Sequence, residues 1–194
     1  MSTIVAVIKN GIACIAADSL TSFGEVRQSA EFVTDSDKII NFEKDGDNNY
    51  LGIVGSAAHH LVMQDLLNNH PDKIDFSSRA EIFKTFKTIH PILKEEYFLN
   101  GKEDENDAYE SSRVDALIVN SSGIYGLYSL REVEQYSKFW AVGSGSEFAL
   151  GAMLAVYEQF DNAEQIARAG IRAGTTFDTS SSMPMKCFSI KGVS

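Results

Sequence analysis

Ser2 brings together two groups that could perform acyl transfer. We expect Met1 to be removed, because a small second residue permits it, and Ser2 would then carry a hydroxyl and a free α-amine on one Cα. The α-amine has a pKa of about 7.7–8.0 in unfolded peptides, close enough to neutral pH to accept the proton of its own hydroxyl. An N-terminal amine is a known activator of Ser or Thr nucleophiles. Ser2 is therefore a candidate nucleophile, although Met-Ser-Thr is also an ordinary start of a first strand.

Four further sites carry groups that could assist such a nucleophile. Asp18 ends an apolar stretch, Lys38 opens another, Ser144 lies in a Gly-Ser-Gly-Ser run, and Asp178 is followed by Ser181 after a helical pattern. Each has an ordinary interpretation as well: an Asp that caps a turn, a solvated Lys, a Ser that caps a helix, and a polar turn. None of these sites is specific when taken alone.

The first of the elements that must position these groups is a hairpin. Residues 3–8 and 12–17 are two β-rich runs, and Asn10-Gly11 between them is a strong hairpin signal. Both runs are apolar at nearly every position instead of alternating, so both faces of these strands should be buried. The sequence therefore predicts that the strands carrying Asp18 lie inside the protein, with layers above and below them.

The remaining elements follow from periodicity and turn residues. We expect a turn at residues 20–24, a polar segment to residue 37, and a loop over the acidic residues 101–112. Apolar residues at helical spacing predict four helices, at residues 56–69, 79–98, 148–157 and 162–174. Pro91 should kink or divide the second of these. β-Rich runs predict further strands at residues 38–42, 50–55, 113–120, 124–129, 139–142 and 185–190.

This order of elements predicts an α+β fold over residues 1–194 as a single domain. Strands that are buried on both faces need covering layers on both sides. A four-layer α/β/β/α sandwich, with two mainly antiparallel sheets between helix layers, meets that requirement.

Composition excludes several other classes of protein. The formal charge of −10 over 194 residues argues against a nucleic acid or an anionic membrane as partner. No apolar run approaches the roughly 20 residues of a membrane helix, and no secretory signal is evident. Cys14 and Cys187 lie in strand-like stretches and are expected to be reduced, packed thiols of a cytoplasmic protein. We expect no metal and no cofactor.

Taken together, these segments resemble the β-type proteasome subunits, and above all their bacterial relatives such as the HslV peptidase and the bacterial proteasome homologues. The resemblance extends over essentially the whole chain, and the matching segments occur in the order of the family. They are Thr3-Ile4-Val5-Ala6-Val7, Asn10-Gly11, Ala17-Asp18-Ser19, Asp37-Lys38, Gly55-Ser56-Ala57-Ala58, Gly143-Ser144-Gly145-Ser146, Phe148-Ala149-Leu150-Gly151 and Asp178 with Ser181.

The resemblance implies an N-terminal nucleophile (Ntn) hydrolase fold and a catalytic role for each matching residue. Ser2 stands where the family has its nucleophile, usually Thr. Lys38 stands where a buried Lys lowers the proton affinity of that nucleophile, and Asp18 where a carboxylate holds the Lys. Three further matches, to positions that hydrogen-bond the α-amine and shuttle its proton, are Ser144, Asp178 and Ser181.

The resemblance also implies how substrate would bind. The backbone N–H of Gly55 matches an oxyanion-hole donor, and Gly at this position lets the substrate backbone approach closely. Ile53 resembles the base of the S1 pocket, which implies a preference for apolar P1 side chains. Thr21 and Ser22 match the segment that pairs with a peptide as an added strand.

The expected function is that of a self-compartmentalising peptidase subunit acting on polypeptides. The resemblance implies homo-oligomeric stacked rings of six or seven subunits, with an ATPase unfoldase as an optional partner. Two alternatives remain open: a catalytically silent ring or scaffold subunit, and a small-molecule amidase of the same class, since fold does not determine substrate.

Overall fold

The first two strands form the predicted hairpin. The computed structural model describes residues 2–102, 105–128 and 132–193. Strand β1 (Ile4–Lys9) pairs antiparallel with β2 (Ile12–Asp18) from Ile4 opposite Ala17 to Lys9 opposite Ile12. Asn10 and Gly11 have φ values of 51° and 72°, the left-handed conformation that a two-residue hairpin turn requires. The start of β1 therefore lies beside the end of β2.

Two more strands complete a four-stranded sheet in the order β10-β1-β2-β11. Both β10 (Phe139–Val142) and β11 (Met185–Lys191) run antiparallel to their neighbours. From Ile4 to Val7, every side chain of β1 is fully buried, which confirms that this strand is covered on both faces.

The second sheet has five strands in the order β5-β6-β7-β8-β9, all antiparallel to their neighbours. The strands are β5 (Ile39–Lys44), β6 (Asp47–Val54), β7 (Asp115–Asn120), β8 (Gly123–Tyr128) and β9 (Glu132–Tyr136). Strand β9 is not predicted from the sequence, because an edge strand with mostly polar side chains lacks an apolar pattern. Ser129, which was expected in the fourth of these strands, lies outside the described residues.

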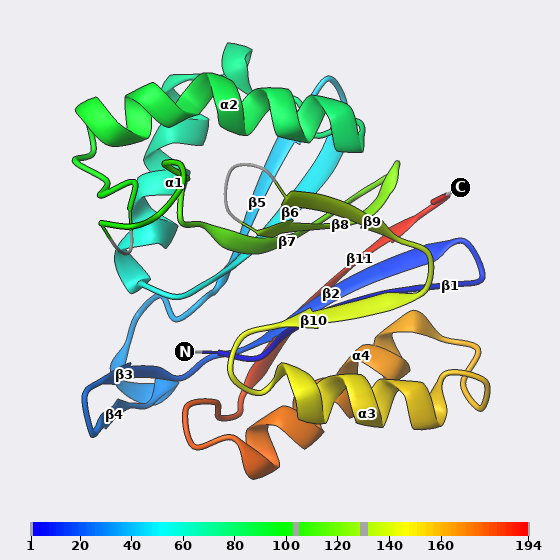
Figure 1. The fold of residues 1–194 in the computed structure, drawn as a ribbon. Coiled ribbons are helices and arrows are strands. Elements are labelled where there is room, and N and C mark those ends of the chain that lie inside the picture. Colours follow the sequence, from blue (N-terminus) through cyan, green and yellow to red (C-terminus); the bar gives the residue numbers. More distant parts are fainter. Residues whose placement is uncertain (1, 103–104, 129–131, 194) are drawn as a thin grey trace.

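Helices cover the outer faces of both sheets, so the predicted α/β/β/α sandwich is confirmed (Figure 1). Helices α1 (Ala57–Asn69) and α2 (Arg79–Glu95) pack on the five-stranded sheet, and α3 (Ser146–Val156) and α4 (Ala163–Phe177) pack on the four-stranded sheet. Within the described residues, no helix combines the length and apolarity needed to cross a membrane.

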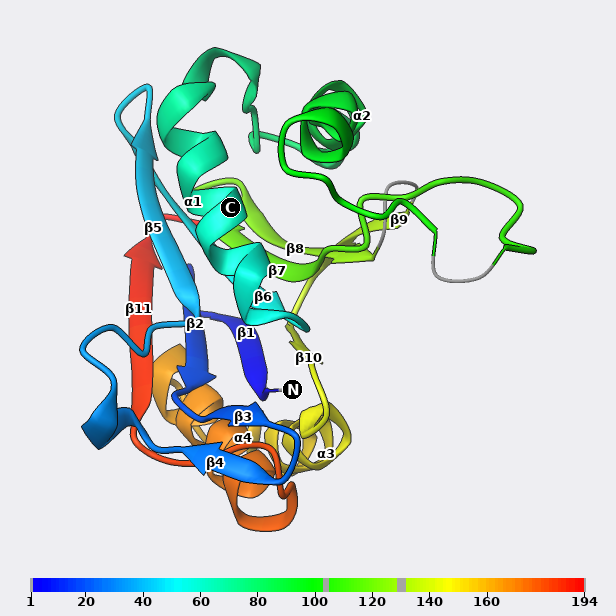
Figure 2. The same ribbon diagram turned by 90° about the vertical axis from the view of Figure 1, so that its left-hand side faces the viewer.

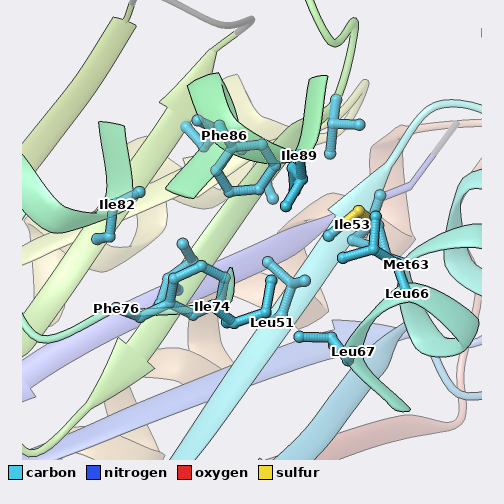
Figure 3. Packing of buried hydrophobic residues seen from close by; sticks show 14 of the residues in the cluster. Leu51, Ile53, Met63, Leu66, Leu67, Ile74, Phe76, Ile82, Phe86 and Ile89 are labelled. Carbon is cyan, nitrogen blue, oxygen red and sulfur yellow. The ribbon is translucent and has the colours of Figure 1, made fainter. Parts of the chain in front are cut away.

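Three hydrophobic clusters fill the spaces between the layers. One lies under α1 and α2, where Leu51 and Ile53 of β6 meet Met63 of α1 and Phe86 of α2 (Figure 3). A second joins the two sheets, and the third lies between the four-stranded sheet and α3 and α4. Burial of this apolar surface drives the packing of the layers.

The segment after β2 differs from the prediction. Residues 20–24 are not a simple turn, because Thr21–Phe23 forms β3 and pairs antiparallel with β4 (Val26–Gln28). The hairpin is short and largely exposed, so its sequence has little apolar patterning. In both Figure 1 and Figure 2 it lies at the same end of the molecule as the start of β1.

Three other expectations need correction. Helix α2 passes through Pro91 without a break and ends at Glu95; its apolar face is deeply buried, and this packing offsets the roughly 3 kcal/mol cost of an internal proline. Helix α4 continues three residues past Gly174 to Phe177. The acidic segment has no regular structure where it is described, but its end is not solvated, since Ser112 is fully buried.

Candidate active site

The candidate residues come from six chain segments that meet at one end of the two sheets. In the four-stranded sheet, the start of β1 lies beside the ends of β2 and β10 and near the start of β11. In the five-stranded sheet, the start of β5 lies beside the end of β6, and the backbone N–H of Ile53 donates to the Lys38 carbonyl at 3.2 Å. Antiparallel pairing therefore brings residues far apart in the sequence to a common edge.

Asp18 and Lys38 form a buried ion pair in this region. The Lys38 Nζ lies 2.7 Å from Asp18 Oδ1, and their side chains are 12% and 0% exposed. The carboxylate also accepts the backbone N–H groups of Thr3 on Oδ1, at 2.9 Å, and of Leu20 and Ser182 on Oδ2, at 3.0 and 3.1 Å. Four donors thus converge on one carboxylate.

Burial lowers the pKa of Lys38 below its ordinary value, and the attraction and hydrogen bond of Asp18 only partly oppose this effect. Removing an ammonium from water disfavours its charged form, while a neighbouring carboxylate favours it. Lys38 can therefore be paired with Asp18 as a cation and still give up its proton more readily than a surface lysine.

Ser144, Asp178 and Ser181 form a second hydrogen-bonded group. The hydroxyls of Ser144 and Ser181 both donate to Asp178 Oδ2, at 2.7 and 2.6 Å. Burial acts to raise the pKa of Asp178, but these two hydroxyls and the Ser180 N–H outweigh it and hold the pKa below the usual value. Asp178 therefore stays ionised and fixes the direction of both hydroxyls.

The backbone of Ser2 lies between these two groups. Its carbonyl accepts the N–H of Gly145 at 3.4 Å and lies 3.5 Å from the Ser144 hydroxyl oxygen, and the residue is only 5% exposed. Gly143 has a φ of 95°, and a Cβ at this position would lie 2.1 Å from the Ser2 carbonyl oxygen. Only glycine allows the loop after β10 to approach Ser2 this closely.

Gly55 directly follows β6, at the point where the chain turns into α1. Its φ is 102°, a conformation that favours glycine, and Ser56 then caps α1 by accepting the Ala58 N–H at 3.3 Å. The N-terminus of α1 carries a partial positive charge. A Cβ built on Gly143 would lie 3.3 Å from Cγ1 of Val54, the residue before Gly55. Because Gly143 also contacts the Ser2 carbonyl, the end of β6 adjoins the Ser2 region.

The three expected substrate-binding residues lie on two sides of this cluster. Thr21 and Ser22 are half-buried in β3, and β3 is anchored at its base because the Leu20 N–H donates to Asp18. Ile53 lies in β6, with its side chain beneath α1 and 6% exposed (Figure 3). Most of its surface contacts the core, and it is not among the residues that line the two cavities beside the cluster.

Two cavities open beside the cluster. One of about 470 Å³ begins at Gly55 and runs between α1 and the segment after α2, with Val62, Met63 and Leu93 among its walls. The other, of about 460 Å³, begins at Val54 and Gly143 and extends along β8, β9 and β10. Either cavity could receive part of a polypeptide that approaches Ser2.

Two residues of this site, Thr3 and Ser182, are not predicted from the sequence. Thr3 is fully buried, and its hydroxyl lies 2.7 Å from the hydroxyl of Ser181. Ser182 contributes the backbone N–H that binds Asp18. A β-branched residue at the start of a strand has an ordinary explanation, and a backbone donor carries no side-chain signal, so neither could be identified from residue type.

Neither a metal centre nor a disulfide is found within the described part of the chain. These residues include no group of three or more His, Cys, Asp or Glu side chains that could hold a metal ion. Cys14 and Cys187 are free thiols on neighbouring strands, with their sulfur atoms 2.8 Å apart.

Comparison with solved structures identifies close relatives. The chain is 39% identical to the BPH of Thiobacillus denitrificans in complex with epoxomicin, with a TM-score of 0.88 over 99% of both chains. A second structure of the Thiobacillus denitrificans BPH matches at the same identity, with a TM-score of 0.87 over 99% of this chain and 98% of the other.

Two more distant structures share the fold. HslV from Trypanosoma brucei is 19% identical, with a TM-score of 0.71 over 97% of this chain and 99% of the other. Anbu, an ancestral β-subunit from Yersinia bercovieri, is 12% identical, with a TM-score of 0.68 over 97% of this chain and 81% of the other. No protein-family model and no curated protein matches the chain.

Proposed function

Because this chain belongs to the bacterial proteasome homologues, relatives of HslV and of the β-type proteasome subunits, we propose that it cleaves peptide bonds with Ser2 as an N-terminal nucleophile. The observation that carries this proposal is the convergence of the Asp18–Lys38 pair and the Ser144–Asp178–Ser181 group on the backbone of Ser2 and Thr3. Both groups are of the kind that an amine-activated hydroxyl requires.

In the proposed first half-reaction, the α-amine of Ser2 accepts the proton of its own hydroxyl while the oxygen attacks the scissile carbonyl. Lys38 favours the developing negative charge on the nucleophile, and Asp18 holds Lys38 in place. The N–H of Gly55 stabilises the tetrahedral oxyanion, a contribution commonly of about 10²–10³ in rate. The amine then gives the proton to the leaving amino group, and an ester on Ser2 remains.

In the second half-reaction, water replaces the leaving group. The same amine accepts a proton from a water molecule as the water oxygen attacks the ester. It returns that proton to the Ser2 oxygen when the acyl group departs. Ser144, Asp178 and Ser181 would hold the amine in position throughout, because their hydrogen bonds fix the two hydroxyls around one carboxylate.

We infer an apolar P1 preference from Ile53, an apolar residue of β6 that lies two positions before Gly55. A polypeptide substrate would pair with Thr21 and Ser22 of β3 as an added strand. The preference is measured with fluorogenic peptides that differ only at P1. Leu or Phe should be cleaved at a higher kcat/KM than Arg or Asp, and the reverse order would contradict this assignment.

We infer assembly into stacked rings of six or seven subunits, held together by the outer helix layer. Phe148, Leu154 and Phe177 of α3 and α4 are 44%, 71% and 67% exposed, and exposed apolar side chains of this size are typical of interfaces. Mass measurement in solution tests this: a mass of 12 or 14 subunits supports the inference, whereas a stable monomer contradicts it. An ATPase unfoldase remains an optional partner, and we expect the protein to act in the cytoplasm.

The nucleophile is tested with the purified assembly and with epoxomicin, the compound bound to the relative from Thiobacillus denitrificans. Epoxomicin is a peptide epoxyketone. One of its electrophilic carbons can react with a hydroxyl and a second can react with an amine. Intact mass measurement should show loss of Met1 and the addition of one inhibitor. Ser2→Ala should abolish both labelling and peptide cleavage, whereas Ser2→Thr should retain both.

Ser137→Ala is a matched control, because this serine is exposed in the turn before β10 and should behave as wild type. Equal peptide cleavage by Ser2→Ala and wild type would refute the mechanism. An intact assembly that loses Met1 but neither reacts nor cleaves peptides would identify a silent ring subunit, and cleavage of small amides alone would identify an amidase.

A further inference from the structure

Thr3 links the two halves of the candidate site through its main chain and its side chain. Its backbone N–H donates to Asp18 Oδ1 at 2.9 Å, and its carbonyl accepts the Asp18 N–H at 3.1 Å. Its side-chain oxygen lies 2.7 Å from the hydroxyl of Ser181. The residue that follows the proposed nucleophile is thus bound to both the Asp18–Lys38 pair and the Asp178 group.

The direction of the hydrogen bond between Thr3 and Ser181 follows from counting protons. A serine hydroxyl has one hydrogen, and that of Ser181 is donated to Asp178 Oδ2 at 2.6 Å. Asp178 cannot donate in return, because its pKa is held below the usual value and it is ionised at neutral pH. Thr3 must therefore donate to Ser181, which gives a chain from Thr3 through Ser181 to Asp178.

Two glycines hold the Thr3 side chain in one position. A Cβ built on Gly145 would lie 2.0 Å from Thr3 Oγ1, and one built on Gly174 would lie 2.5 Å from the same atom and 2.6 Å from Thr3 Cγ2. Because the backbones of these residues contact the side chain directly, and because Thr3 is fully buried, its hydroxyl has little freedom to point elsewhere.

We propose that Thr3 is a positioning residue for the N-terminal nucleophile, whose hydroxyl sets the orientation and acceptor strength of Ser181. This inference rests on the proposed function, in which Ser181 binds the α-amine of Ser2. With its hydrogen given to Asp178 and one lone pair engaged by Thr3, Ser181 keeps a single lone pair for that amine. Without the Thr3 donor, Ser181 would be a stronger acceptor and would favour the charged ammonium, which cannot act as a base.

The test compares Thr3→Val, which replaces the hydroxyl by a methyl group of similar size, with Thr3→Ser, which keeps the hydroxyl. Thr3→Val should lower kcat for peptide cleavage roughly 10- to 100-fold, the scale expected when a reacting group is misplaced. KM should stay near the wild-type value, because Thr3 is buried and cannot contact substrate. The acid limb of the pH–kcat profile should move to higher pH, and Thr3→Ser should restore both quantities.

Among the described residues, the charged groups around the Ser2–Thr3 backbone are Asp18 at the end of β2, Lys38 before β5 and Asp178 after α4. All three are unchanged in these variants, so a shift of the acid limb reports on the hydroxyl of residue 3. If Thr3→Val does not assemble, Thr3→Ala and Thr3→Ser replace the comparison, since both lack the methyl group and differ only in the hydroxyl.

Wild-type kcat and an unmoved acid limb in Thr3→Val would overturn the inference. So would equal losses in Thr3→Ser and Thr3→Ala, which would assign the effect to lost packing. The Ser2→Ala variant distinguishes failure of the Thr3 proposal from failure of the proposed function. If Ser2→Ala cleaves peptides, the proposed mechanism fails. If Ser2→Ala is inactive and Thr3→Val behaves as wild type, only the role of Thr3 is refuted.

Discussion

Replacement of Asp18 by Asn tests whether this carboxylate organises the site. Its two oxygens accept four donors, with Thr3 and Lys38 on Oδ1 and Leu20 and Ser182 on Oδ2. An amide has one acceptor oxygen and one NH₂ donor. Whichever way the amide turns, two of the four donors face an NH₂ group, and the buried ammonium of Lys38 loses its counter-charge.

The expected cost follows from that geometry. Removing one partner of a buried ion pair costs about 3–5 kcal/mol, out of a total unfolding free energy of about 5–15 kcal/mol for a typical protein. For a chain of this length, 1 kcal/mol corresponds to about 2–4 °C in Tm. We therefore expect Asp18→Asn to lower Tm by about 6–20 °C and to abolish peptide cleavage.

A thermal melt of the assembly measures the change in Tm, and urea unfolding measures the change in unfolding free energy. Both are performed at fixed protein concentration, since oligomer stability depends on concentration. Lys38→Met and the double variant complete a double-mutant cycle with Asp18→Asn. The double variant should be less destabilised than the sum of the single variants, because it leaves no buried charge unpaired. Asp161→Asn, at an exposed position, is the control and should change the unfolding free energy by no more than about 0.5 kcal/mol.

A loss below about 1 kcal/mol for Asp18→Asn, or strictly additive losses in the cycle, would refute this reasoning. Such results would mean that the four donors find other partners and that Lys38 does not depend on Asp18 for its counter-charge.

Three further predictions concern activity. Peptide cleavage should rise with pH as the α-amine of Ser2 loses its proton and should fall as Lys38 titrates, at a pH below the ordinary lysine pKa. Lys38→Arg should remove this alkaline fall, and persistence of the fall would assign it to another group. Gly143→Ala should lower the rate of peptide cleavage about 100-fold or more, because the new Cβ would displace Ser2. Gly151→Ala is the control and should cleave at the wild-type rate, because a Cβ at this position meets open space. Equal cleavage rates for the two variants would show that the loop after β10 tolerates a side chain at residue 143. Ile53→Ala should raise the kcat/KM of P1 Trp relative to P1 Ala, and an unchanged ratio would exclude Ile53 from the S1 pocket.

Local sequence features were sufficient to predict most of the elements. The Asn10-Gly11 turn between two wholly apolar runs predicted a hairpin with both faces covered, because turn chemistry and burial pattern act over a few residues. Helical spacing predicted all four helices. The exceptions were segments with weak patterns, such as the exposed β3–β4 hairpin and the edge strand β9.

Residue type and resemblance pointed to the groups that the fold then joins. Ser144, Asp178 and Ser181 were selected from the sequence, and they share hydrogen bonds across two loops. The same is true of Asp18 and Lys38. Thr3 was not selected, because a threonine at the start of a strand has no chemical signature until its neighbours are known.

The sequence by itself determined which stretches become helices and strands and which side chains could do chemistry, because those properties depend on neighbouring residues. Only the tertiary structure decided which strand ends meet and which hydroxyl donates to which. The contact between Thr3 and Ser181 spans 178 positions and that between Ser144 and Asp178 spans 34. Such contacts depend on the register and order of two packed sheets, which no local pattern encodes.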